Sequence, residues 1–278
     1  MDPREPQFPT LLRMSDPLLL GTLYGGTSAL GYTAANICLR QVALDADPVW
    51  VSCIKAVPVA TVASCVVASG LWRGLTMFPP PRQIVLLLLS AVFMQLAGNV
   101  AFQGALGNIG LAVTVPLSFG CMLLGVALLG RLWLLEPITP RSALAMLVLF
   151  ASITVLSFAA NTGGGLPNDT TFTWAVVFAG VGAACLSGIG YATANVVIRR
   201  TLTGGANLSA TLLMMSMTGV VGLGILSAVR VGIAGLWQTG RFDLLVMLGA
   251  GVFNAIAFYS LAKALQLLPV VQVNLLSA

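Results

Sequence analysis

The sequence contains no histidine, and charged residues make up only 8% of its 278 positions. An ordinary soluble domain has about 25% charged residues, so this chain has too few charges to cover a water-soluble fold. The absence of histidine excludes a histidine-dependent catalyst and a histidine-ligated metal site. A disordered chain would have low hydrophobicity, whereas 58% of this sequence is hydrophobic. The class that remains is an all-α polytopic membrane protein.

Long uncharged runs lie between the few charged residues and predict the membrane spans. The longest run, 83–130, has 48 residues without a charge. Because a spanning helix needs about 20 apolar residues, this run must hold two helices, and the segment 107–110 is the natural hinge between them. Continuous apolar runs favour helices over the alternating segments of a membrane barrel. The predicted spans are 18–40, 49–70, 84–107, 109–130, 142–160, 173–198, 208–231 and 244–266, and a ninth begins near 268.

The distribution of Lys and Arg predicts the orientation in the membrane. With the N-terminus inside, nine basic residues fall on the cytoplasmic side and three, Arg40, Arg230 and Arg241, fall outside. We therefore expect a multi-pass protein of a cell membrane, with its N-terminus in the cytoplasm. The net charge of +5 is interpreted as this topology signal, so no nucleic-acid partner is expected.

The residues that enzymes need are missing from the predicted spans. There is no carboxylate pair inside a span, no Gly-x-Ser-x-Gly motif and no phosphate-binding Gly-Lys-Ser/Thr loop. The five cysteines lie in predicted spans, and none is paired at metal-ligand spacing, so they are interpreted as small apolar helix residues. The sequence thus predicts neither catalytic residues nor a metal or cofactor.

The chain resembles itself when it is shifted by 159 residues. Residues 28–40 lie on 187–199 with six of thirteen positions identical, and the same shift places Arg82 on Arg241 and Gln95 on Asn254. The first copy holds five spans, an odd number, so the second copy is expected to lie upside down in the membrane. Inverted repeats of this kind are typical of secondary transporters.

The repeat divides the chain and predicts that it is incomplete. Residues 1–17 are a cytoplasmic tail, 18–160 the first five-helix repeat, 161–172 an external linker, and 173–278 the second repeat, cut off in its fourth helix. The second copy would end about 41 residues beyond Ala278 if it matched the first. We therefore expect a C-terminally truncated chain.

Three segments carry a resemblance to a known family. Small residues over 31–40 end in a basic residue, Lys55 lies early in the second span, and the fourth span runs into Leu-Leu-Gly-Arg-Leu-Trp-Leu-Leu-Glu-Pro-Ile-Thr-Pro at 128–140. With the repeat, they resemble the ten-span EamA-type members of the drug/metabolite transporter superfamily. The sequence departs from the family pattern in two ways. Gly130 and Glu136 are further apart than in the short Gly-Glu turn that is typical of the family, and the Trp-Gly pair that many members carry in the first helix is absent. The resemblance implies a transporter of small metabolites, amino acids or drugs, mostly in bacterial inner membranes.

Polar residues inside the predicted spans are the candidates for substrate binding. Polar groups are costly in the bilayer, so they usually face the bundle interior or a cavity. Two Tyr-Asn pairs are repeat mates, and three amides form an i, i+4, i+8 stripe along the third span. The same amides and hydroxyls can instead hold helices together by hydrogen bonds. The full candidate set is Tyr32, Asn36, Lys55, Gln95, Asn99, Gln103, Tyr191, Asn195 and Asn254.

Lys55 is the one charge well inside a predicted span, and two interpretations of it stay open. A lysine at the bilayer centre costs about 2.5–3.5 kcal/mol on insertion scales. It could extend outward to water along its own stem, or it could be the cationic partner of an anionic substrate group. No Asp or Glu lies inside a span to bind a proton or a cationic drug.

The sequence as a whole predicts a secondary transporter of a small metabolite, neutral or anionic rather than cationic, working by alternating access. The alternatives are a membrane scaffold or sensor without transport, and a nonfunctional truncated fragment. The expected partners are a small-molecule substrate and the lipid bilayer. A small-xxx-small pattern at Gly21 and Gly25 is compatible with a homodimer.

Overall fold

The computed structural model describes residues 17–138 and 174–277, together with positions 140, 143, 144, 146–148 and 151. Almost all of the predicted tail, the span 142–160 and the linker 161–172 lie outside these residues. Within the described part the secondary structure is helical, with no strand. The helices are α1 (Pro17–Val42), α2 (Pro48–Trp72), α3 (Pro81–Phe93), η1 (Met94–Val100), α4 (Ala101–Ile109), α5 (Leu111–Trp133), α7 (Trp174–Thr203), α8 (Leu208–Thr218), η2 (Gly219–Leu223), α9 (Gly224–Trp237), α10 (Arg241–Leu267) and α11 (Val270–Ser277).

Local sequence signals place the helix ends. Asp47 caps α2, because its Oδ1 accepts hydrogen bonds from two backbone N–H groups of the first turn, at 2.9 and 3.2 Å. Asn207 caps α8 in the same way. Caps of this kind satisfy N–H groups that have no partner inside the helix, and each is worth about 1 kcal/mol. The helical structure is interrupted at Gly110, between α4 and α5, where a φ of 73° suits glycine. The break is thus at the last residue of the predicted hinge 107–110.

Six helices of the described part are long and apolar enough to cross a membrane. Two of them are composite: α3, η1 and α4 form one helix, and α8, η2 and α9 form another. α1 has 26 residues but is not among the six, since Gly, Thr, Ser and Tyr residues interrupt its apolar run. The described residues therefore have the all-helical architecture of a multi-pass membrane protein, which confirms the predicted class.

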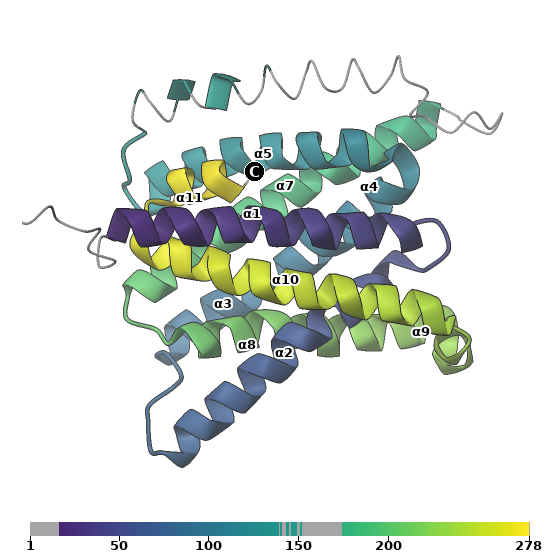
Figure 1. Ribbon diagram of the computed structural model, residues 1–278, viewed down its shortest axis with the longest axis horizontal. Helices are drawn as coiled ribbons and strands as arrows, with labels where there is room; N and C mark the ends of the chain where they lie inside the picture. The colour runs from purple at the N-terminus through teal and green to yellow at the C-terminus, as the bar shows by residue number, and fades with distance from the viewer. Residues whose placement is uncertain are drawn as a thin grey trace, which may run out of the picture.

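All five tryptophans lie at or close to a helix end. Trp72, Trp133 and Trp237 are the last residues of α2, α5 and α9, Trp174 is the first of α7, and Trp50 is the third of α2. In Figure 1 most of the long helices run roughly along the horizontal axis, with α2 oblique to it, so these helix ends lie at the two ends of the bundle. Tryptophan is enriched where a membrane protein meets the headgroup layer, so the long axis of the bundle is the expected membrane normal.

Close helix contacts at glycine hold the bundle together. α1 lies beside α10 along the front of the bundle in Figure 1, and α7 packs against η1 and α4. A Cβ added to Gly31 of α1 would lie 2.9 Å from the Cβ of Ala257 in α10. A Cβ added to Gly190 of α7 would lie 2.6 Å from the backbone nitrogen of Gly98 in η1. The 159-residue shift relates these two contacts to each other.

Candidate functional site

A central cavity of about 80 Å³ lies between the helices. Its wall is drawn from α1, α2, η1, α4, α5, α7, α8, α10 and α11. The lining combines amides, tyrosines and one lysine with apolar and aromatic side chains. Such a mixture of apolar walls and a few convergent polar groups is typical of small-molecule sites. The residues of the wall are Tyr32, Ala35, Asn36, Leu39, Lys55, Ala56, Val59, Met94, Gln95, Asn99, Phe102, Phe119, Met122, Tyr191, Asn195, Ser216, Asn254, Phe258, Leu261, Asn274 and Ser277.

Eight of the nine candidate residues from the sequence line this cavity. They are Tyr32, Asn36, Lys55, Gln95, Asn99, Tyr191, Asn195 and Asn254. The ninth, Gln103, is buried but is not part of the wall. It lies one turn further along the third span, where its Nε2 donates a hydrogen bond to the carbonyl of Leu39 at 3.2 Å. Gln103 therefore joins α4 to α1, and the predicted amide stripe reaches the cavity only at its first two members.

A chain of hydrogen bonds along one wall begins at Lys55. Its Nζ donates to Asn99 Oδ1 at 2.7 Å, and Tyr191 Oη donates to the same oxygen at 3.0 Å. Asn99 Nδ2 donates to Gln95 Oε1 at 2.6 Å, and Gln95 Nε2 donates to the carbonyl of Met215 at 2.9 Å. The chain connects α2, η1, α7 and α8. Buried polar groups that are all paired in this way fix the positions of the helices that carry them.

Two π-helical segments meet beside Gln95. Gln95 lies in η1, and Gly219 is the first residue of η2. In a regular α-helix the N–H of Gly219 would donate to the carbonyl of Met215, but here it donates to Ser216, and the Gln95 side chain donates to Met215. A Cβ at Gly219 would lie 2.6 Å from Gln95 Nε2, so glycine leaves room for this amide. π-helical turns are rare and occur frequently at functional sites.

A pair of asparagines forms a second polar contact in the wall. Asn195 Nδ2 donates to Asn274 Oδ1 at 2.6 Å, and Asn274 Nδ2 donates to the carbonyl of Val270 at 2.7 Å. The sequence reasoning missed Asn274. Its partner under the 159-residue shift is Val115, so repeat symmetry gave no signal. Its position in the ninth apolar segment was the available signal, because a buried amide in an apolar run needs a partner.

Three lining side chains have no hydrogen-bond partner within the described residues. They are Tyr32 and Asn36 on α1 and Asn254 on α10, and all three are half-buried. A polar group that is withdrawn from water and left unpaired costs free energy. These groups are therefore the ones that a solute in the cavity could satisfy at the smallest cost to the fold.

Lys55 is the sole charged residue among those that line the cavity. Its side chain is 5% exposed, and its Nζ is bound to Asn99 rather than directed along the helix to the membrane surface. Every carboxylate of the described residues lies near a helix end, away from the cavity wall. The site thus has positive formal charge and amide dipoles, and no fixed negative charge.

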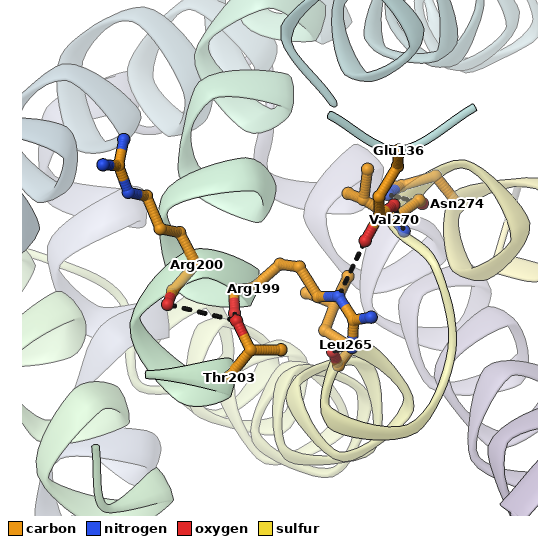
Figure 2. A network of polar contacts seen from close by, with 7 residues as sticks. All are labelled: Glu136, Arg199, Arg200, Thr203, Leu265, Val270 and Asn274. Carbon is orange, nitrogen blue, oxygen red and sulfur yellow. Dashed lines mark hydrogen bonds and ion pairs between the residues drawn. The ribbon is translucent and has the colours of Figure 1, made fainter. Parts of the chain in front are cut away.

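Figure 2 shows a separate polar network at the end of the bundle where α5 ends and α11 begins. Arg199 Nε lies 3.1 Å from Glu136 Oε1, and Arg199 Nη1 donates to the carbonyl of Leu265 in α10. Glu136 Oε2 accepts a hydrogen bond from the N–H of Val270 at 2.8 Å. Val270 is the first residue of α11, where a carboxylate is favoured by the helix dipole. One carboxylate thereby joins α7 to the start of α11.

An equivalent arginine contact lies at the opposite end of the bundle. Arg40 Nη1, near the end of α1, donates to the carbonyl of Leu106 in α4 at 2.9 Å. Arg40 and Arg199 are related by the 159-residue shift, and so are Leu106 and Leu265. Both arginines therefore make the same contact to the same repeat position, one at each end.

The basic residues of the described part are distributed unequally between the two ends of the bundle. Six lie toward the end of the bundle where α1 begins, namely Arg73, Arg82, Arg131, Arg199, Arg200 and Lys263. Three lie toward the other end, namely Arg40, Arg230 and Arg241. Arg230 is paired there with Asp47 at 3.3 Å.

Comparison with known proteins finds a similar fold among solved structures. No protein-family model matches the chain, and no curated protein matches it. A solved crystal structure of a protein aligns with 92% of this chain and 83% of its own chain, with a TM-score of 0.66 and 19% sequence identity. At this identity the likeness concerns the fold alone.

Proposed function

We propose that this protein is a secondary transporter that carries a small polar solute across a membrane through the central cavity. The solute is neutral or anionic rather than cationic. The two halves of the chain act as inverted repeats and expose the cavity to each side of the membrane in turn. The resemblance of the sequence to EamA-type members of the drug/metabolite transporter superfamily agrees with this proposal.

The observation that carries the proposal is the composition of the cavity wall. Three pairs of polar lining residues are related by the 159-residue shift: Tyr32 with Tyr191, Asn36 with Asn195, and Gln95 with Asn254. A site built from matching positions of two halves can be approached from either side by related movements. A scaffold has no need for a polar cavity at this point, and polar groups there cost stability.

A matched contact and the directions of two helices support the inverted arrangement. Arg40 with Leu106 and Arg199 with Leu265 are the same contact in the two halves. The repeat mates α1 and α7 run in opposite directions along the bundle in Figure 1. Two similar halves with opposite directions have two mirror-related packings of comparable energy, which is what alternating access requires.

The charges support both the substrate class and the orientation. A cationic solute would find no carboxylate among the lining residues, and burying an unpaired charge is costly. The six basic residues at the end where α1 begins, against three at the other, support a cytoplasmic location for that end.

The proposal is tested with the purified chain in sealed proteoliposomes. The vesicles are loaded with a defined mixture of small neutral, anionic and cationic metabolites, and the released solutes are measured by mass spectrometry. We expect selective release that is absent from protein-free vesicles. Asn36→Ala removes an amide with no partner among the described residues, so release should fall roughly 2- to 12-fold, the value of one hydrogen bond. Thr33→Ala, on the exposed face of the same helix, is the matched control and should leave release unchanged.

Two results would contradict the proposal. Release of no solute beyond that of protein-free vesicles would favour a scaffold or sensor. Equal loss of release in the Asn36 and Thr33 variants would show that the effect does not come from the cavity.

A further inference from the structure

We infer that Lys55 is the counter-ion for a single negative charge on the transported solute, so that the substrate is a small organic monoanion of the carboxylate class. This inference rests on the proposed function and narrows it. It starts from the position of one buried cation whose partner in the structure is neutral.

The Lys55 ammonium group is held inside the protein. It lies about two turns from the start of α2, and the side chain is 5% exposed. Its Nζ donates to Asn99 Oδ1 at 2.7 Å, which is a neutral acceptor. An amide oxygen compensates part of the cost of removing an ammonium group from water, and a full opposite charge compensates far more. The cavity in front of Lys55 is thus prepared for an anion.

The carboxylates of the described residues are not available to Lys55. Asp47 is paired with Arg230, and Glu136 with Arg199. Asp45 and Asp243 lie at helix ends, away from the cavity wall. None of the described carboxylates therefore supplies the counter-charge, and we assign it to a ligand.

The wall indicates one negative charge rather than two. Sites for phosphate and other dianions gather several cationic or bidentate donors, above all arginine. This cavity presents one lysine, and no arginine lines it. A second negative charge would remain unpaired in a wall of amides, tyrosines and phenylalanines. A carboxylate matches the available charge, and the hydroxyl of Tyr32, which lines the same cavity and has no partner among the described residues, can supply a further hydrogen bond.

The surrounding hydrogen bonds allow Lys55 to change partners. Asn99 Oδ1 also accepts a hydrogen bond from Tyr191, and Asn99 Nδ2 is bound to Gln95. If the ammonium group turns to a carboxylate, Asn99 keeps both of these contacts. Binding an anion therefore leaves no amide of this chain without a partner.

The test uses proteoliposomes that contain the full chain and a mixture of matched pairs, each a monocarboxylate and its primary amide of the same carbon skeleton. Phosphate monoesters and primary amines of similar size complete the mixture. We expect the wild-type protein to release carboxylates at least about tenfold faster than the paired amides, the ratio expected from one charge-assisted hydrogen bond. Phosphate esters and amines should stay inside.

Substitutions of two lysines assign the preference to one residue. Lys55→Gln should abolish the preference for carboxylates over amides, and Lys55→Arg, which keeps the charge, should restore part of it. Lys263→Gln makes the same change of charge outside the cavity and should keep the wild-type ratio. The ratio of the two solutes is unaffected by the amount of folded protein, and the wild-type comparison needs no variant.

The other outcomes of this experiment contradict the inference, the proposed function or both. Release of amides at the rate of carboxylates, or preference for phosphate esters, overturns the monocarboxylate assignment and leaves the proposed transport intact. Release of amines at that rate overturns both this assignment and the proposed preference for neutral or anionic solutes. A carboxylate preference that persists in Lys55→Gln overturns the role of Lys55. Release of no solute by the wild-type protein overturns the proposed function together with this inference.

Discussion

The contact between α7 and η1 gives the most direct stability prediction. A Cβ at Gly190 would lie 2.6 Å from the backbone nitrogen of Gly98, a distance that real Cβ atoms do not show, and a backbone atom cannot rotate away. Gly190→Ala therefore forces α7 and η1 apart. At Gly182, on the same helix, an added Cβ meets nothing within 4 Å. Both substitutions gain the same helix propensity, about 1 kcal/mol, so the difference between them isolates the overlap.

The overlap should cost about 1–3 kcal/mol, as overpacking usually does. In thermal unfolding of the purified protein in detergent, we expect Gly190→Ala to melt roughly 2–12 °C below Gly182→Ala. The neighbouring Tyr191 should also lose its contact with Asn99, because the helix that carries it has moved. Equal melting temperatures for the two variants would refute the packing of α7 against η1.

Three further predictions concern the polar groups and the membrane position. Asn99→Ala leaves both the buried Lys55 and Tyr191 without their acceptor and should lower the unfolding free energy by about 1–3 kcal/mol. Asn36→Ala removes no such contact and should change the unfolding free energy by no more than about 0.5 kcal/mol. Equal losses of stability in the melting curves of the two variants would contradict this difference. Glu136→Gln should destabilise the protein, and a double-mutant cycle with Arg199→Gln should give a coupling of about 0.5–3 kcal/mol, whereas strictly additive effects would exclude the ion pair. The tryptophans at the helix ends should be quenched more strongly by lipids brominated near the headgroup than near the chain end, and the reverse order would place the membrane elsewhere.

The sequence predicted the helical class and most of the cavity because both depend on patterns that stand out in an apolar chain. Polar residues in the spans are few, and because polar groups are costly in lipid, their side chains face the interior of the helix bundle. The mates Asn36 and Asn195 therefore meet at one cavity, as their shared register suggested. The sequence also indicated the helix break at Gly110, because glycine adopts the positive φ that ends a helix without the steric cost of a side chain.

The remaining features depend on contacts between helices that no local pattern encodes. Gln103 fits the same stripe as Gln95 and Asn99, yet it finds a backbone carbonyl of α1 before it reaches the cavity. Asn274 joins the wall through Asn195, a partner 79 residues away in the chain. The π-helical segments lie where Gln95 approaches Gly219, and they have no sequence signature of their own.

The measurement that tests the central claim most directly is the accessibility of Asn36→Cys in a cysteine-free background. The protein is reconstituted in vesicles, and a membrane-impermeant maleimide is applied first from one side and then from the other. A cavity that opens to each side in turn predicts labelling from both sides, with Thr33→Cys on the lipid-facing side of the same helix unlabelled. Labelling of Asn36→Cys from one side alone, or from neither, would contradict a transport pathway through this cavity.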